Sequence, residues 1–124
     1  MSERMSHAEY VHLQRVRALD AARAIISGQR SVIDGCRFLT ALRFELELPD
    51  VSKDFDPIVG IDSDSDHLPV GESRQYWAAD ALERKDIEIA EFESSYREYA
   101  IQACAVLIAK LEKTVQQAVH GNTH

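Results

Sequence analysis

The chain has 124 residues, which is enough for one hydrophobic core and too few for two domains. Hydrophobic residues make up 45% of it and charged residues 28%, a balance that is typical of globular proteins and argues against intrinsic disorder. The net charge of −7 argues against nucleic-acid binding, and the longest apolar run, residues 103–109, is far shorter than the roughly 18 residues that a membrane span needs.

The N-terminal segment is polar and carries acidic side chains, so it does not have the pattern of a secretion signal or a transit peptide. We therefore expect a cytoplasmic protein. Cys36 and Cys104 both fall within apolar helical stripes, and neither has a partner at C-x-x-C spacing. We expect two buried free thiols, because disulfides are disfavoured in a reducing cytosol.

The first predicted helix begins with a capping box, in which Ser6 and Glu9 stand three residues apart. Apolar residues then recur at three- and four-residue steps as far as Gly28, which is a typical helix end. The pattern predicts a helix over residues 6–27.

A second stripe of apolar residues begins after Ser31 and predicts a helix over residues 31–48, ended by Pro49. The short gap to the first helix indicates an antiparallel helical hairpin. Arg37 and Arg43 are expected to be solvated or paired with nearby acids rather than to form an anion site.

Residues 49–71 show no clear helical period and are predicted to form a long acidic loop. Nine acidic residues and a single lysine lie between Glu45 and Glu72, so this part of the chain holds the whole excess of negative charge. Its apolar residues indicate an ordered loop that packs against the helices.

Two further helices are predicted, over residues 72–84 and 86–119, which either run together or kink around residues 84–86. The expected fold is therefore all-α: a three- to four-helix up-and-down bundle in one domain, with the long acidic connection between its second and third helices.

Three aspartates at alternate positions, Asp62, Asp64 and Asp66, resemble the start of an EF-hand calcium loop. The remainder of that loop does not fit, because His67 replaces the required glycine and Ser73 replaces the bidentate glutamate. We predict no metal, no cofactor and no catalytic residue. A divalent-metal or small-ligand site formed by the three aspartates and His67 is the alternative.

Tyrosine, tryptophan and arginine dominate the energetics of many protein interfaces, and Arg74, Tyr76 and Trp77 follow the acidic segment directly. We assign structural roles to Trp77, as a core residue, and to Arg74, as the internal partner of a loop aspartate. The predicted partner-binding residues are Asp62, Asp64, Asp66, His67, Glu72 and Tyr76.

The run from Gly60 to Gly71, followed by Arg74 and Trp77, resembles a motif of small bacterial helical proteins of unassigned function, which reads I-D-S-E-T-D-H-L-P-x-G-x-x-R-x-x-W. The similarity extends over residues 60–86, and the chain departs from the motif at Asp64 and Ser65. The resemblance implies a cytoplasmic bacterial protein and no particular activity. Short acidic helical proteins of this kind are similar to antidotes encoded beside a toxin.

The concentration of acidic residues predicts a non-enzymatic protein-binding domain, of the immunity or antitoxin type, that docks an acidic surface onto a basic partner such as a toxin. No nucleic acid and no membrane is expected as a partner. A homodimer that pairs through the last helix is a further alternative.

Overall fold

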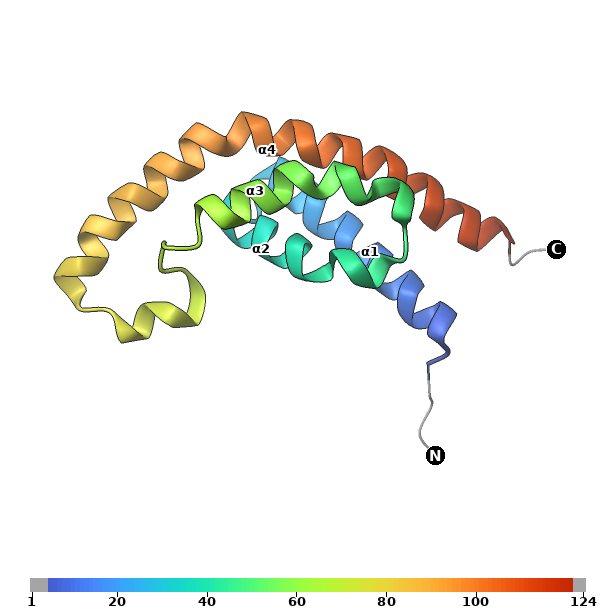
Figure 1. Ribbon diagram of the computed structural model, residues 1–124, viewed down its shortest axis with the longest axis horizontal. Helices are drawn as coiled ribbons and strands as arrows, with labels where there is room; N and C mark the ends of the chain where they lie inside the picture. Colours follow the sequence, from blue (N-terminus) through green and yellow to red (C-terminus); the bar gives the residue numbers. More distant parts are fainter. Residues whose placement is uncertain (1–4, 122–124) are drawn as a thin grey trace.

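The computed structural model describes residues 5–121, with side chains as far as residue 118, and this part of the chain is helical without strands (Figure 1). Four α-helices and three short 3₁₀ helices follow one another: α1 (His7–Ser27), α2 (Val32–Leu42), η1 (Arg43–Leu46), η2 (Pro49–Phe55), α3 (Asp56–Asp64), η3 (Gly71–Tyr76) and α4 (Ala79–Gly121). The predicted all-α class is confirmed.

Helix α1 begins and ends as its sequence predicts. The Ser6 hydroxyl accepts a hydrogen bond from the Glu9 amide at 3.1 Å, and the Glu9 carboxylate accepts one from the Ser6 amide at 3.2 Å. Gly28 ends the helix in the left-handed conformation, with φ of 82°.

Helix α2 is shorter than predicted, because the chain tightens into η1 after Leu42. This winding places Leu46 in the core, and Arg15 donates a hydrogen bond to the Leu46 carbonyl at 2.8 Å. Glu47 then adopts a left-handed conformation with φ of 51°, which ends the helical path before Pro49.

The prediction of a loop over residues 49–71 is wrong for most of its length, because η2 and α3 occupy residues 49–64. Pro49 and Pro57 lie in the first turns of these two helices, where proline costs no hydrogen bond. Val51, Phe55 and Ile58 point into the core at helical spacing.

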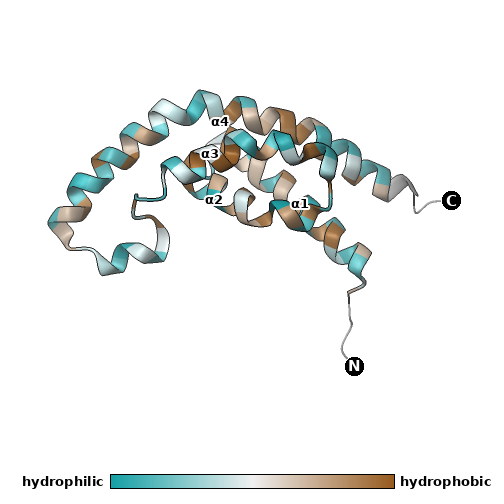
Figure 2. Cartoon of the chain, in the orientation of Figure 1, coloured by the Kyte–Doolittle hydropathy of each residue, from teal (hydrophilic) through white to brown (hydrophobic). Residues whose placement is uncertain are grey.

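Most of the buried side chains form one cluster, to which α1, α2, η1, η2, α3 and the C-terminal half of α4 all contribute (Figure 2). Cys36 and Cys104 are buried free thiols in this cluster, as expected. Burial raises the pKa of Cys36 to about 12 and that of Cys104 to about 11, so both thiols stay protonated at neutral pH.

Helix α4 is one continuous helix of 43 residues and contains the whole predicted helix over residues 86–119, whereas the separate helix predicted over residues 72–84 is wrong. The sequence contains no glycine or proline between Ala79 and His120 that would interrupt it. Residues 72–76 belong instead to η3, and Trp77, in an extended conformation, separates η3 from α4.

Two side chains of α4 hold the turn between α1 and α2. The Glu93 carboxylate accepts hydrogen bonds from the amides of Val32 at 2.8 Å and Ile33 at 2.9 Å, at the N-terminus of α2. Arg97, one turn later, donates to the carbonyls of Ile25 and Ile26 at 3.3 and 3.0 Å, at the C-terminus of α1. Each charge complements the helix dipole that it meets.

Candidate functional site

Residues 70–91 form an arm that projects from the packed helices. It consists of η3 and the first turns of α4, which curve away from the core and lie at the left of Figure 1, whereas Phe92 and Tyr96 already pack against the core. Between Val70 and Tyr99 no residue is fully buried. The hydrophobic core therefore gives this segment little support.

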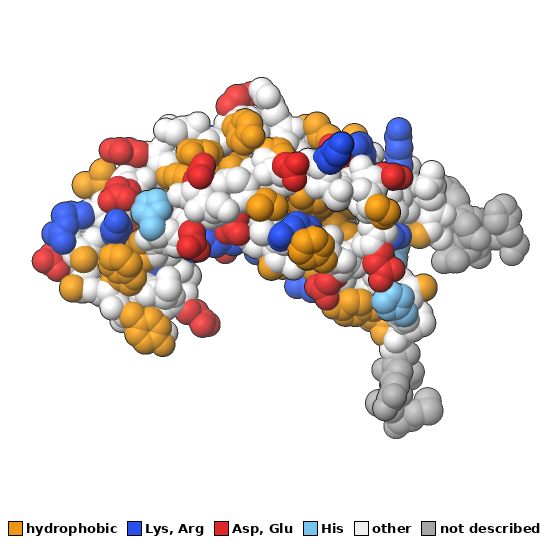
Figure 3. All heavy atoms as spheres, in the orientation of Figure 1, with side chains coloured by type: hydrophobic (Ala, Val, Ile, Leu, Met, Phe, Trp, Pro, Cys, Tyr) orange, Lys and Arg blue, Asp and Glu red, His pale blue; other side chains and the backbone are white. Residues whose placement is uncertain are grey.

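The arm exposes large hydrophobic side chains, which Figure 3 shows interspersed with acidic and basic ones. The exposed fractions are 83% for Tyr76, 62% for Ile87 and 38% for Trp77. The prediction of Trp77 as a core residue is wrong, because the extended segment between η3 and α4 lies beyond the reach of the core. The ammonium group of Lys85 lies 5.9 Å from the centre of the Trp77 ring.

Arg74 holds η3 against α4, although not through the partner that we predicted. It forms a bidentate ion pair with Asp86 of α4, at 2.6 and 3.1 Å, and the hydrogen bonds from Arg74 lower the pKa of Asp86. The expectation of an internal pair with a loop aspartate is wrong. Because the pair is exposed to solvent, it is expected to contribute little to stability.

The predicted partner-binding aspartates differ in their surroundings. Asp62 is half-buried beside Arg37, with 3.8 Å between its Oδ1 and the arginine Nε. Burial raises the pKa of Asp62, and the charge of Arg37 opposes this shift. Asp64 accepts a hydrogen bond at 2.8 Å from the hydroxyl of Tyr96, whose pKa is raised as a result. Asp66 is exposed.

Arg37 is the residue that fixes the segment after α3, a role that sequence reasoning missed. Besides Asp62, its guanidinium donates to the carbonyls of Ser65 and Leu68, the latter at 3.1 Å. The expectation that Arg37 pairs with a nearby acid identified one of these three contacts. The two carbonyl contacts depend on tertiary structure and left no signal in the sequence.

The remaining predicted residues lie at or near the arm. Glu72 and Tyr76 are exposed on η3, and His67 is exposed just before the arm. The imidazole Nε2 of His67 lies 3.7 Å from the carboxylate of Glu88 in α4. The exposed members of the predicted set are thus Asp64, which is bonded to Tyr96, together with Asp66, His67, Glu72 and Tyr76.

The four residues of the alternative metal site are not brought together. Asp62 and Asp64 stand two positions apart on α3, so their side chains point in different directions, one toward Arg37 and the other toward Tyr96. Within residues 5–121, no three His, Cys, Asp or Glu side chains form a group that could hold a metal ion.

A shallow recess of about 280 Å³ lies where the segment after α3 meets α4. His67 and Leu68 line it from one side, and Glu88, Glu91, Phe92, Ser95 and Tyr96 line it from α4. The predicted site residue His67 thus lies in a concave part of the surface.

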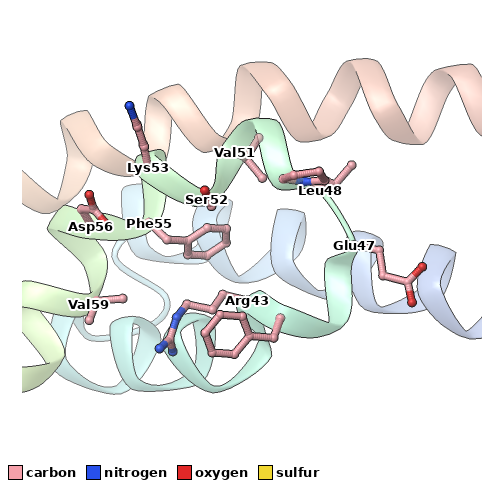
Figure 4. Close-up of a pocket in the computed structure, with 11 residues that line it drawn as sticks. Arg43, Glu47, Leu48, Val51, Ser52, Lys53, Phe55, Asp56 and Val59 are labelled. Carbon is pink, nitrogen blue, oxygen red and sulfur yellow. The ribbon is translucent and has the colours of Figure 1, made fainter.

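A second pocket, of about 470 Å³, lies between η1, η2 and the start of α3 (Figure 4). Phe55 points into it, and Arg43 stacks over the ring of exposed Phe44 at 4.2 Å. Two cations and two acids surround it: Arg43, Lys53, Glu47 and Asp56. Because these charges balance, the pocket favours neither sign of ligand.

Within residues 5–121, no helix is both long enough and apolar enough to span a membrane. Comparisons with protein families, with curated proteins and with solved structures found no match.

Proposed function

We propose that the protein is a non-enzymatic, cytoplasmic protein-binding module, of the immunity or antitoxin type, whose arm docks onto a partner with a basic surface. The observation that carries the proposal is the arm itself, which exposes Tyr76, Trp77 and Ile87 while none of its residues is buried. Aromatic side chains on a projecting, weakly supported segment are typical of a surface that is covered on binding.

The charge of the arm supports a basic partner. Glu72, Asp80 and Glu83 are exposed near Tyr76 and Trp77 in the sequence, and Asp66 is exposed just before the arm. An acidic surface accelerates encounter with a basic one and disfavours acidic partners. Compared with the sequence-based set, the proposed surface keeps Asp66, Glu72 and Tyr76 and adds Trp77 and Ile87. Asp62 and Asp64 are already engaged within the chain.

Site-specific photocrosslinking in the native cell tests this proposal. A photoreactive amino acid at position 76 is expected to capture one protein, whereas the same group at exposed Gln116, in the C-terminal half of α4, is expected to capture none. Association of the purified pair should slow as salt increases, and Asp66→Asn with Glu72→Gln should slow it further.

Two results would contradict the proposal. Equal capture from positions 76 and 116 would mean that the arm is not a preferred surface. A crosslinked product with the mass of two copies of this chain would favour the homodimer instead.

A further inference from the structure

The recess at the base of the arm has a rigid apolar wall. The rings of Phe92 and Tyr96 stack with their centres 4.0 Å apart and their planes within 9°. The hydroxyl of Tyr96 is fixed by its hydrogen bond to Asp64, and the side chain of Leu68 is buried beside them. The wall therefore has a defined shape before any ligand arrives.

The rim of the recess is acidic. Glu88 and Glu91 stand three positions apart on α4, so their carboxylates lie on neighbouring parts of one helix face. Lys85 contacts Glu88 at 3.2 Å and partly neutralises it, and His67 lies 3.7 Å from the same carboxylate. Glu91 forms no ion pair or hydrogen bond with another side chain among residues 5–118.

We propose that this recess binds an arginine side chain of the protein that docks on the arm, an inference that rests on the proposed function. The methylene groups of an arginine can pack on the aromatic wall formed by Phe92 and Tyr96, while its planar guanidinium reaches the carboxylates of Glu88 and Glu91. Arginine suits the site better than lysine, because a flat guanidinium can stack on an aromatic ring and bond a carboxylate at the same time.

The test uses N-acetyl-argininamide as the probe, added at low salt to the full chain labelled with ¹⁵N. We expect saturable shifts confined to the amides of residues 67–68 and 88–96, with a dissociation constant on the order of millimolar. The citrulline analogue has almost the same shape without the charge and should bind about tenfold more weakly, as should the lysine analogue.

Variants in the recess give the matched comparison. Glu88→Gln with Glu91→Gln should weaken binding of the arginine probe about tenfold, whereas Glu98→Gln, at an exposed acid outside the recess, should change it less than about twofold. Lys85→Gln should strengthen binding, because it removes the cation that competes for Glu88. All of these side chains contact solvent, so the fold is expected to tolerate each change.

Equal binding of the citrulline or the lysine analogue would overturn the assignment to arginine, as would shifts spread over all acidic surfaces or a double variant that binds like the parent chain. Failure of the proposed function is distinguishable. If the probe binds as expected but the group at position 76 captures no protein, the arginine site is supported and the docking role of the arm is contradicted. If the group at position 76 captures a protein but the probe does not bind, only the proposal of an arginine site is contradicted.

Discussion

At the scale of single residues, two helical glycines differ in the space around them: Gly35 is tightly packed against a neighbouring helix, and Gly60 is open. A Cβ atom added at Gly35 in α2 would lie 2.4 Å from both Cγ1 and Cδ1 of Ile25, which is itself fully buried in α1. A Cβ added at Gly60 in α3 would meet nothing within 4 Å. Gly35 therefore permits the close approach of α1 and α2, whereas Gly60 has no such role.

We expect Gly35→Ala to lower the free energy of unfolding by about 1–3 kcal/mol, because Ile25 must leave its packed position. Gly60→Ala should raise it by about 0.5–1 kcal/mol, because alanine restricts the unfolded chain and favours the helix. Urea unfolding of the two variants beside the parent chain measures both changes. Shifts of the same sign would contradict this account.

The candidate site was predictable only in part, for reasons that differ between residues. Glu72 and Tyr76 are exposed as a binding surface requires, and composition alone pointed to them. Trp77 was assigned to the core because a large apolar ring is most often buried, and the sequence gives no sign that its segment leaves the core. The recess was missed because Leu68 and Glu91 come together only in the folded chain.

At the scale of secondary-structure elements, the α1–α2 turn depends on side chains that are distant in the sequence. Glu93 of α4 supplements the local cap at the N-terminus of α2, because its carboxylate accepts hydrogen bonds from two amides there. Ser31 adds a third bond, to the amide of Asp34 at 3.0 Å. The N-terminus of α2 is therefore satisfied jointly by its own cap and by α4.

Glu93→Gln is expected to lower the free energy of unfolding by about 1–2 kcal/mol, because it removes the charge that faces the helix dipole and leaves an amide without an acceptor. Glu98→Gln, at an exposed acid on the same helix, should stay within about 0.5 kcal/mol of the parent chain. Chemical denaturation of the two variants under identical conditions makes the comparison. An equal decrease in the free energy of unfolding of both variants would contradict a stabilising role for the hydrogen bonds from Val32 and Ile33 to Glu93.

The elements that sequence reasoning identified are those with local signals. The capping box of α1 and the apolar stripe of α2 needed no tertiary information. The helices η2 and α3 were missed because Pro49 was interpreted as the end of the helical pattern, although Pro49 and Pro57 both lie in first turns, where proline starts helices. The helical spacing of Val51, Phe55, Ile58 and Ile61 was the signal that could have revealed them.

At the scale of the whole molecule, α4 joins two regions of unequal support. Its C-terminal half places Ala100, Cys104, Leu107 and Leu111 in the core, whereas residues 79–91, in the arm, bury no side chain fully. Helices without tertiary packing are marginally stable in water. The single helix should therefore not open as one unit.

Hydrogen exchange is expected to show this difference along α4. Amides of residues 82–90 should exchange at least about a hundredfold faster than those of residues 103–111, because opening the arm exposes little apolar surface. Exchange read by NMR resolves both stretches in one sample. Uniform protection from one end of α4 to the other would contradict a weakly supported arm.

The continuity of α4 also determines how the protein behaves in solution. At 1.5 Å per residue its 43 residues trace a path of about 65 Å, whereas a compact domain of 124 residues, with a radius of gyration of about 14 Å, is only about 36 Å across. A particle that carries such a long, curved helix diffuses more slowly than a sphere of equal mass. In size-exclusion chromatography it will elute earlier than a compact protein of the same mass, so a monomer will give the apparent mass of a dimer. Light scattering or sedimentation equilibrium measures the mass independently of shape.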